Sequence, residues 1–100
     1  MKVDLSSILK RSINHSFSEV DGEIIMLNIE KGSYFTLNKV GSEIWKMLDK
    51  PNVVSDIIDQ LQINYEIEKS ECENDTMPYL EELVENGLVE VIDEKNKESF

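Results

Sequence analysis

The sequence predicts a small α+β domain in which a three-stranded antiparallel sheet is followed by three helices, the arrangement of a winged helix-turn-helix body. Apolar and polar side chains alternate over residues 13–37, glycine turns interrupt the alternation, and apolar side chains recur at helical spacing further along. One hundred residues make one domain. We expect a flexible lead-in over residues 1–10, a folded body over 11–92 and a charged disordered tail over 93–100.

The three strands are predicted from alternation and from the turns between them. Asp21-Gly22 supplies two residues that adopt positive φ readily, as a two-residue hairpin requires, and Lys31-Gly32 turns the chain again. The second strand is rich in β-branched side chains, so we expect Ile25 to Leu27 to be buried on both faces. The predicted strands are residues 13–20, 23–29 and 33–37.

The second half of the chain has the signals of helix starts and stops. Asn38 and Asn52 are predicted N-caps, and Pro51 ends the first helix. Ser70 begins an S-x-x-E capping box, but Pro78 lies inside that third helix and should kink it or mark a restart. The predicted helices run from Asn38 to about Asp49, from Asn52 to about Asn64 and from Ser70 to a C-cap at Gly87, and residues 88–92 form a short closing strand.

The charge of the chain argues against several classes of partner. The net charge is −11, and from Glu66 onward the acidic residues are opposed only by Lys69, Lys95 and Lys97. Such a field repels phosphate, so we expect neither nucleic acid nor an anionic membrane as a partner. The first ten residues contain no long apolar segment, and a single cysteine excludes an internal disulfide, so we expect a cytoplasmic protein.

The residues needed for catalysis or metal binding are scarce. The chain has one histidine, His15, and one cysteine, Cys72, and it contains no CxxC, HExxH, GxGxxG or phosphate-loop motif. His15 falls on the apolar side of its predicted strand, where a packed imidazole is the simplest interpretation. We therefore expect no catalytic residues, no metal and no cofactor.

A winged helix-turn-helix body usually binds DNA through a basic helix. Here the third helix would carry Glu81, Glu82 and Glu85, and the only arginine of the chain is Arg11. A protein-binding role fits this charge better. The third strand has one side unpaired, which is a template for another strand, and the third helix beside it can complete a groove for an extended peptide.

Two sequence runs resemble the PqqD-like peptide-binding domains, also called RiPP precursor recognition elements. The first is G-x-x-x-x-LN-x-x-G-x-x-IW-x-x-L from Gly32 to Leu48, and the second is D-x-x-x-YL-x-x-L-x-x-x-GL from Asp75 to Leu88. The resemblance covers roughly residues 13–89. It implies that the leader segment of a ribosomally made precursor peptide docks as a strand against residues 33–37 and lies along the third helix.

The resemblance also indicates which side chains line the groove. In the third strand Phe35 and Leu37 share one face, while Tyr34 and Thr36 share the other; Tyr34 could equally be an ordinary exposed aromatic residue. On the third helix a stripe at i, i+4 and i+7 could face the peptide, although its tyrosine could equally pack in the core. The predicted peptide contacts are Ser33, Tyr34, Phe35, Thr36 and Leu37 on the strand and Cys72, Thr76, Tyr79 and Leu83 on the helix.

These observations favour a non-catalytic protein that captures a leader peptide and presents it to separate enzymes. Freestanding members of the family of this size are similar to the small partner of lasso-peptide leader proteases, so a lasso-peptide protease and cyclase are the expected partners, or another modifying enzyme. The alternatives are a carrier of the pyrroloquinoline quinone precursor peptide, a winged-helix transcriptional regulator, and a structural subunit that dimerises through its open strand edge.

Overall fold

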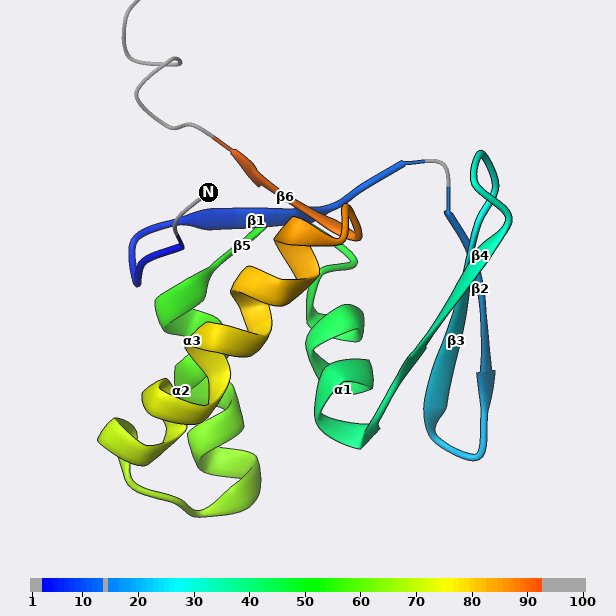
Figure 1. Ribbon diagram of the computed structural model, residues 1–100. Coiled ribbons are helices and arrows are strands. Elements are labelled where there is room, and N and C mark those ends of the chain that lie inside the picture. The colour runs from blue at the N-terminus through cyan, green and yellow to red at the C-terminus, as the bar shows by residue number, and fades with distance from the viewer. Residues whose placement is uncertain (1–2, 14, 93–100) are drawn as a thin grey trace, which may run out of the picture.

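Two three-stranded antiparallel sheets and three helices make up the fold in the computed structural model, which describes residues 3–13 and 15–92 (Figure 1). We call the sheet with order β2-β3-β4 the wing sheet and the sheet with order β5-β1-β6 the body sheet. The elements are β1 (Ile8–Arg11), β2 (His15–Val20), β3 (Glu23–Asn28), β4 (Ser33–Leu37), α1 (Lys39–Met47), β5 (Asn52–Val53), α2 (Val54–Tyr65), α3 (Lys69–Glu85) and β6 (Val89–Ile92).

The wing sheet is the predicted three-stranded meander, and its position before three helices confirms the predicted fold class. Asp21 and Gly22 have φ angles of 54° and 83°, as a type I′ hairpin turn requires. Only one face of the sheet is covered: Ile24 and Met26 are fully buried, whereas Ile25 is 38% exposed. The expectation that residues 25–27 are buried on both faces is therefore wrong, because alternate side chains of β3 face the uncovered side of the sheet.

The body sheet was not predicted, and it includes residues that were expected to form a flexible lead-in. Residues 8–11 form β1, which pairs with β6 on one side and β5 on the other, and Leu9 in its middle is fully buried. The expected flexible lead-in is thus wrong for residues 8–10, because they gain partners that lie far away in the sequence. The closing strand is confirmed as β6, and the predicted disordered tail over 93–100 lies outside the described residues.

Of the three predicted helix N-caps, one is confirmed and two are wrong. The Gly41 N–H donates to Asn38 Oδ1 at 2.8 Å, so Asn38 caps α1 as predicted. Asn52 instead lies in β5, and α2 begins after Val53 without a side-chain cap. Helix α3 begins at Lys69, before the predicted capping box, and its N-cap residue makes no side-chain hydrogen bond either.

Helix α3 runs through Pro78 as one element and ends as predicted at Gly87. Pro78 lies at an exposed position inside the helix, so the alternative of a restart after Asp75 or Thr76 is wrong. Gly87 has a φ angle of 76°, and its N–H donates to the Val84 carbonyl while the Leu88 N–H donates to the Leu83 carbonyl, both at 3.0 Å. These two bonds define a Schellman motif, which turns the chain from α3 into β6.

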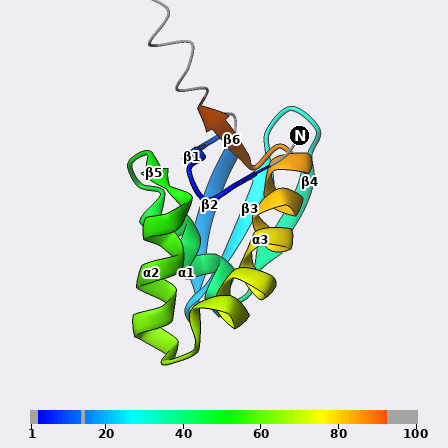
Figure 2. The same ribbon diagram turned by 90° about the vertical axis from the view of Figure 1, so that its left-hand side faces the viewer.

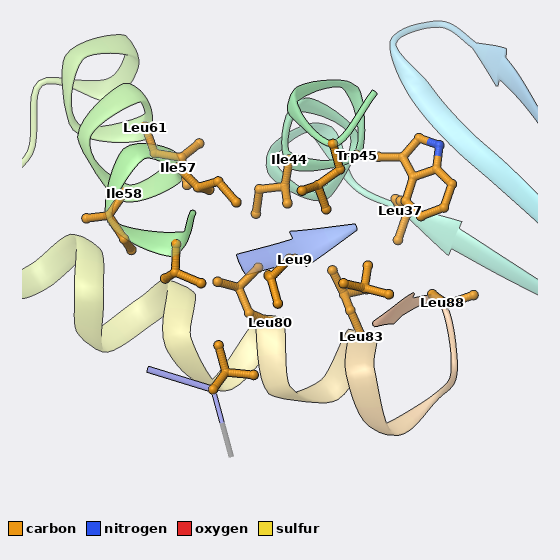
Figure 3. Packing of buried hydrophobic residues seen from close by; sticks show 14 of the residues in the cluster. Leu9, Leu37, Ile44, Trp45, Ile57, Ile58, Leu61, Leu80, Leu83 and Leu88 are labelled. Carbon is orange, nitrogen blue, oxygen red and sulfur yellow. The ribbon is translucent and has the colours of Figure 1, made fainter. Parts of the chain in front are cut away.

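The core lies between the helices and the two sheets, each of which contributes buried side chains. Leu9 points from β1 into a cluster that includes Ile44 of α1, Ile57 of α2 and Leu80 of α3, all fully buried (Figure 3).

Within residues 3–13 and 15–92 we find no helix with the length and apolar character needed to cross a membrane.

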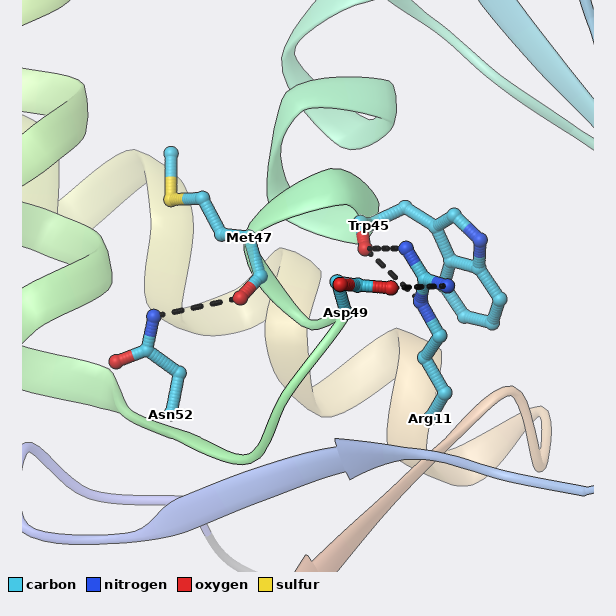
Figure 4. A network of polar contacts seen from close by, with 5 residues as sticks. All are labelled: Arg11, Trp45, Met47, Asp49 and Asn52. Atoms are coloured by element: carbon cyan, nitrogen blue, oxygen red, sulfur yellow. Dashed lines mark hydrogen bonds and ion pairs between the residues drawn. The ribbon is translucent and has the colours of Figure 1, made fainter.

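Arg11 joins the two sheets to α1. Its Nε and Nη2 groups donate to the Trp45 carbonyl at 3.0 and 2.6 Å, and Nη1 lies 3.8 Å from Asp49 Oδ1 (Figure 4). The guanidinium carbon is also 4.8 Å from the Trp45 ring centre and 5.1 Å from that of Phe17 on β2. Burial lowers the pKa of Arg11, and Asp49 opposes that shift. The single arginine of the chain therefore stabilises the fold at this position.

Candidate peptide-binding site

Strand β4 forms an edge of the wing sheet. It pairs with β3 on one side, and among residues 3–13 and 15–92 no strand pairs with its other side. The β4 edge therefore presents backbone N–H and C=O groups that a further strand could bond.

The register shows which groups of β4 point outward. The two-residue turn makes Val20 and Glu23 a hydrogen-bonded pair. Backbone groups alternate in direction along a strand, so every second residue of β3, counted from Glu23, bonds to β2. The residues between them, beginning with Ile24, point their N–H and C=O groups toward β4. Because Ile24 lies opposite Leu37, the residues of β4 that bond to β3 are 33, 35 and 37. The N–H and C=O groups of Tyr34 and Thr36 consequently face the open edge.

A buried serine holds β3 and β4 together where α1 begins. The Ile24 N–H donates to Ser42 Oγ at 2.9 Å, and Ser42 Oγ donates to the Leu37 carbonyl at 3.1 Å. Ser42 is only 1% exposed and lies on the first turns of α1. It thus fixes the β4 edge relative to the helices, a role that no sequence pattern had indicated.

Two hollows lie near the β4 edge, on the side of the molecule where Figure 2 shows α3 and β4. The helix hollow, of about 170 Å³, is lined by Asn38, Val40, Ile44, Asp75, Thr76 and Tyr79. The strand hollow, of about 240 Å³, is lined by Asn28, Lys31, Ser33, Phe35, Glu85, Asn86 and Gly87. A strand added to β4 would have one hollow near each of its ends.

The structure places the predicted strand residues on two faces. Tyr34, 72% exposed, and Thr36 lie on the uncovered face, whereas Phe35 is partly buried and packs against the core. Leu37 is 3% exposed and belongs to the core itself. A peptide can therefore reach the backbone of β4 and the ring of Tyr34, while the Leu37 side chain is closed to it.

The predicted helix residues divide between the hollow and the core. Thr76 and Tyr79 line the helix hollow, and their contact with a peptide stays a prediction. Cys72 and Leu83 are 1% and 3% exposed, and the Cys72 thiol lies 3.6 Å from the Ile58 carbonyl of α2. These two side chains pack in the core of this structure, and we leave them out of the surface that a peptide would contact.

Tyr79 is held at the hollow by a glycine that sequence reasoning had not singled out as a site residue. A Cβ atom on Gly41 would overlap the Tyr79 hydroxyl, so only glycine at this buried position of α1 lets the ring lie across the helix. Burial is the main cause that raises the pKa of Tyr79, and the nearby Glu82 carboxylate adds to it. Gly41 of the LN-x-x-G run and Tyr79 of the YL run thus lie in contact, although they are far apart in the sequence.

The described part of the chain has no candidate metal centre. No group of three or more His, Cys, Asp and Glu side chains there could hold a metal ion. What the site offers is backbone hydrogen bonding beside partly apolar hollows, which is chemistry suited to holding a peptide.

Comparison with known proteins agrees with this geometry. The family described as Coenzyme PQQ synthesis protein D (PqqD) matches residues 23–89. The chain belongs to the PqqD family. This confirms the resemblance drawn from the two sequence runs, and the matched residues extend from β3 through α3 to the start of β6, so they include β4 and α3. No curated protein matches the chain.

A solved structure extends the comparison with the PqqD family. The chain is similar to TbiB1, solved in complex with the TbiA(beta) leader peptide, with 28% sequence identity and a TM-score of 0.76. The match covers 85% of this chain and 99% of that chain. The PqqD-family fold found here is therefore also that of a protein that binds a leader peptide.

Proposed function

We propose that this PqqD-family protein binds the leader segment of a ribosomally made precursor peptide as an added strand on β4 and presents it in the cytoplasm to separate processing enzymes. The observation that carries the proposal is the open β4 edge, where the N–H and C=O groups of Tyr34 and Thr36 face outward between two hollows. The leader peptide bound to TbiB1 supports it.

An added strand would place its side chains alternately on the two faces of the wing sheet. Side chains on the inner face would lie toward the strand hollow beside Phe35 and the helix hollow beside Tyr79. Those on the outer face would lie next to Tyr34 and Thr36. Main-chain hydrogen bonds then supply affinity, and the hollows supply selectivity.

The protein acts in this proposal without catalysing a reaction. The lasso-peptide protease and cyclase, or another modifying enzyme, would act on the leader or the remainder of the precursor while the leader is held. Ordering a flexible peptide costs roughly 2–5 kcal/mol, so we expect a dissociation constant around micromolar.

The proposal is tested by calorimetric titration with the synthetic leader of the cognate precursor, with a scrambled peptide of the same composition as control. We expect binding of the leader alone. Amide chemical-shift changes should concentrate on residues 33–37 and around Thr76 and Tyr79. A flat titration with the verified leader, or shifts confined to α2, would overturn the proposal.

A second candidate is a carrier of the precursor peptide in pyrroloquinoline quinone synthesis, which the description of the matching family favours. It would use the same β4 edge. Titration with that precursor peptide separates the two, since each candidate predicts tighter binding of its own peptide. A transcriptional role is disfavoured because Glu81, Glu82 and Glu85 on α3 would repel the DNA backbone, and a gel shift at physiological salt checks it.

A further inference from the structure

A third hollow, of about 560 Å³, continues from the strand hollow. Its walls come from the connection between β1 and β2, the hairpin between β3 and β4, and the turn between α3 and β6. Four residues line both it and the strand hollow, namely Asn28, Lys31, Asn86 and Gly87. We call it the hairpin hollow, and together with the strand hollow it makes one continuous depression.

One wall of the hairpin hollow exposes an apolar side chain to water. Ile13 is 74% exposed, although it lies among residues of the hollow that include Val84, Val89 and Val91. Water on this side chain is unfavourable, and an apolar group that enters the hollow would displace it.

His15 adds an unused hydrogen-bonding atom to the same wall. Its Nδ1 lies 3.1 Å from the Ile13 carbonyl, which can only accept, so Nδ1 is the donor of that hydrogen bond. Nε2 is buried and has no hydrogen-bond partner among the described residues.

Because β4 is short, part of a bound peptide must lie beyond its ends, and the hairpin hollow lies beyond one of them. Five residues of strand span only about 17 Å, so a longer leader must leave the β4 edge at one of its ends. At the Leu37 end the chain passes directly into α1, whereas at the Ser33 end the strand hollow opens into the hairpin hollow.

We infer that the hairpin hollow holds the part of the leader that continues past the Ser33 end of β4, an inference that rests on the proposed function. This part of the leader places an apolar side chain against Ile13. The same part of the leader lies beside the ring of His15, which is among the residues that line the hollow. The leader site is therefore longer than the strand it pairs with.

The test compares two isoleucines that are almost equally exposed. Ile13→Ser removes the apolar contact in the hairpin hollow, and Ile63→Ser makes the same change on α2, where Ile63 is 71% exposed. With the full synthetic leader of the cognate precursor, we expect Ile13→Ser to weaken binding about five- to tenfold and Ile63→Ser to leave it unchanged. Thermal melting of both variants checks that the fold is retained.

The ring of His15 gives a second measurement that needs no variant. It is the single histidine of the chain, so its ring signals in nuclear magnetic resonance spectra are unambiguous. We expect them to shift when the full leader is added. If the leader shifts the amides of β4 but leaves the His15 ring unchanged, and Ile13→Ser binds as tightly as Ile63→Ser, the inference is overturned while the proposed function stands. Absence of any leader binding overturns both.

Discussion

The wing sheet and the body sheet have the same number of strands, one central and two outer, but they differ in burial and in the segments that they connect. In the body sheet the central strand β1 has a partner on each side, and its Leu9 is fully buried. In the wing sheet β3 is satisfied on both sides, while β4 keeps one side open and the Tyr34 ring beside that edge is 72% exposed.

This difference separates stability from recognition within one small domain. The body sheet connects three distant segments and gains from burial of apolar side chains. In the wing sheet, the outer strand β4 keeps backbone donors and acceptors that another strand could bond, with the exposed Tyr34 beside them. Changes in the body sheet should therefore reduce the free energy of unfolding, whereas changes at the open edge should reduce binding.

The largest effect is expected in the body sheet. Leu9→Ala leaves a cavity between β1 and the helices, and it should lower the free energy of unfolding by about 2–5 kcal/mol. Urea denaturation measures the loss. Leu5→Ala, at a position that is 36% exposed, is the control and should cost less than about 1 kcal/mol. Equal losses in both variants would contradict the central role of β1.

Proline at neighbouring positions of β4 tests the two sides of that strand. Phe35→Pro removes an N–H that faces β3 and leaves its carbonyl partner unpaired, so it should lower the free energy of unfolding by about 1–3 kcal/mol or more. Thr36→Pro removes an N–H that faces the open edge, so it should retain the fold and weaken leader binding by at least about tenfold.

Each proline variant is the control for the other. Denaturation and calorimetric titration of both separate the folding loss from the binding loss. If Thr36→Pro binds the leader normally, the peptide does not pair with β4.

Ser42→Ala should weaken the join between the wing sheet and α1. It leaves the buried Ile24 N–H and Leu37 C=O without their shared partner, which should cost about 1–3 kcal/mol of unfolding free energy. Ser18→Ala, on an exposed position of β2, should change stability by less than about 0.5 kcal/mol. Similar losses in the two variants would show that Ser42 does not connect the strands.

The smallest effect is expected from the exposed ring at the edge. Tyr34→Ala should leave the free energy of unfolding within about 0.5 kcal/mol of the wild-type value, yet weaken leader binding by about 1–2 kcal/mol. Tyr65→Ala, on α2, should not affect binding. A leader that binds Tyr34→Ala as tightly as the wild type would restrict recognition to the backbone and the inner face.

Local signals were enough to predict the wing sheet and the helix ends that depend on one residue. Asp21-Gly22, the Asn38 cap and the Gly87 C-cap each act over a few residues, and the structure has all three. The body sheet has no such signal. Its strands are two to four residues long, and β1 pairs with segments near residues 52 and 90, so packing of the whole chain decides where it lies.

The site was predictable to the same extent. Residues 33–37 were identified as an edge strand because the signals of the meander act over a few residues. The stripe of residues from Cys72 to Tyr79 predicted one face of the third helix. It could not show which other element covers that face. In the structure α2 covers Cys72, and the hollow begins only at Thr76. The contacts of Gly41 and Ser42 depend on side chains far away in the sequence.

The pairing of β1 with β6 also sets an order of events during synthesis on the ribosome. Residues 8–11 are made early, but their longest ladder waits for residues 89–92, about eighty positions later. The wing hairpins close over two to four residues and need no such delay, since short loops close fastest. The β4 edge, on which the peptide is proposed to add as a strand, can thus form while the strand that completes the body sheet is still unmade.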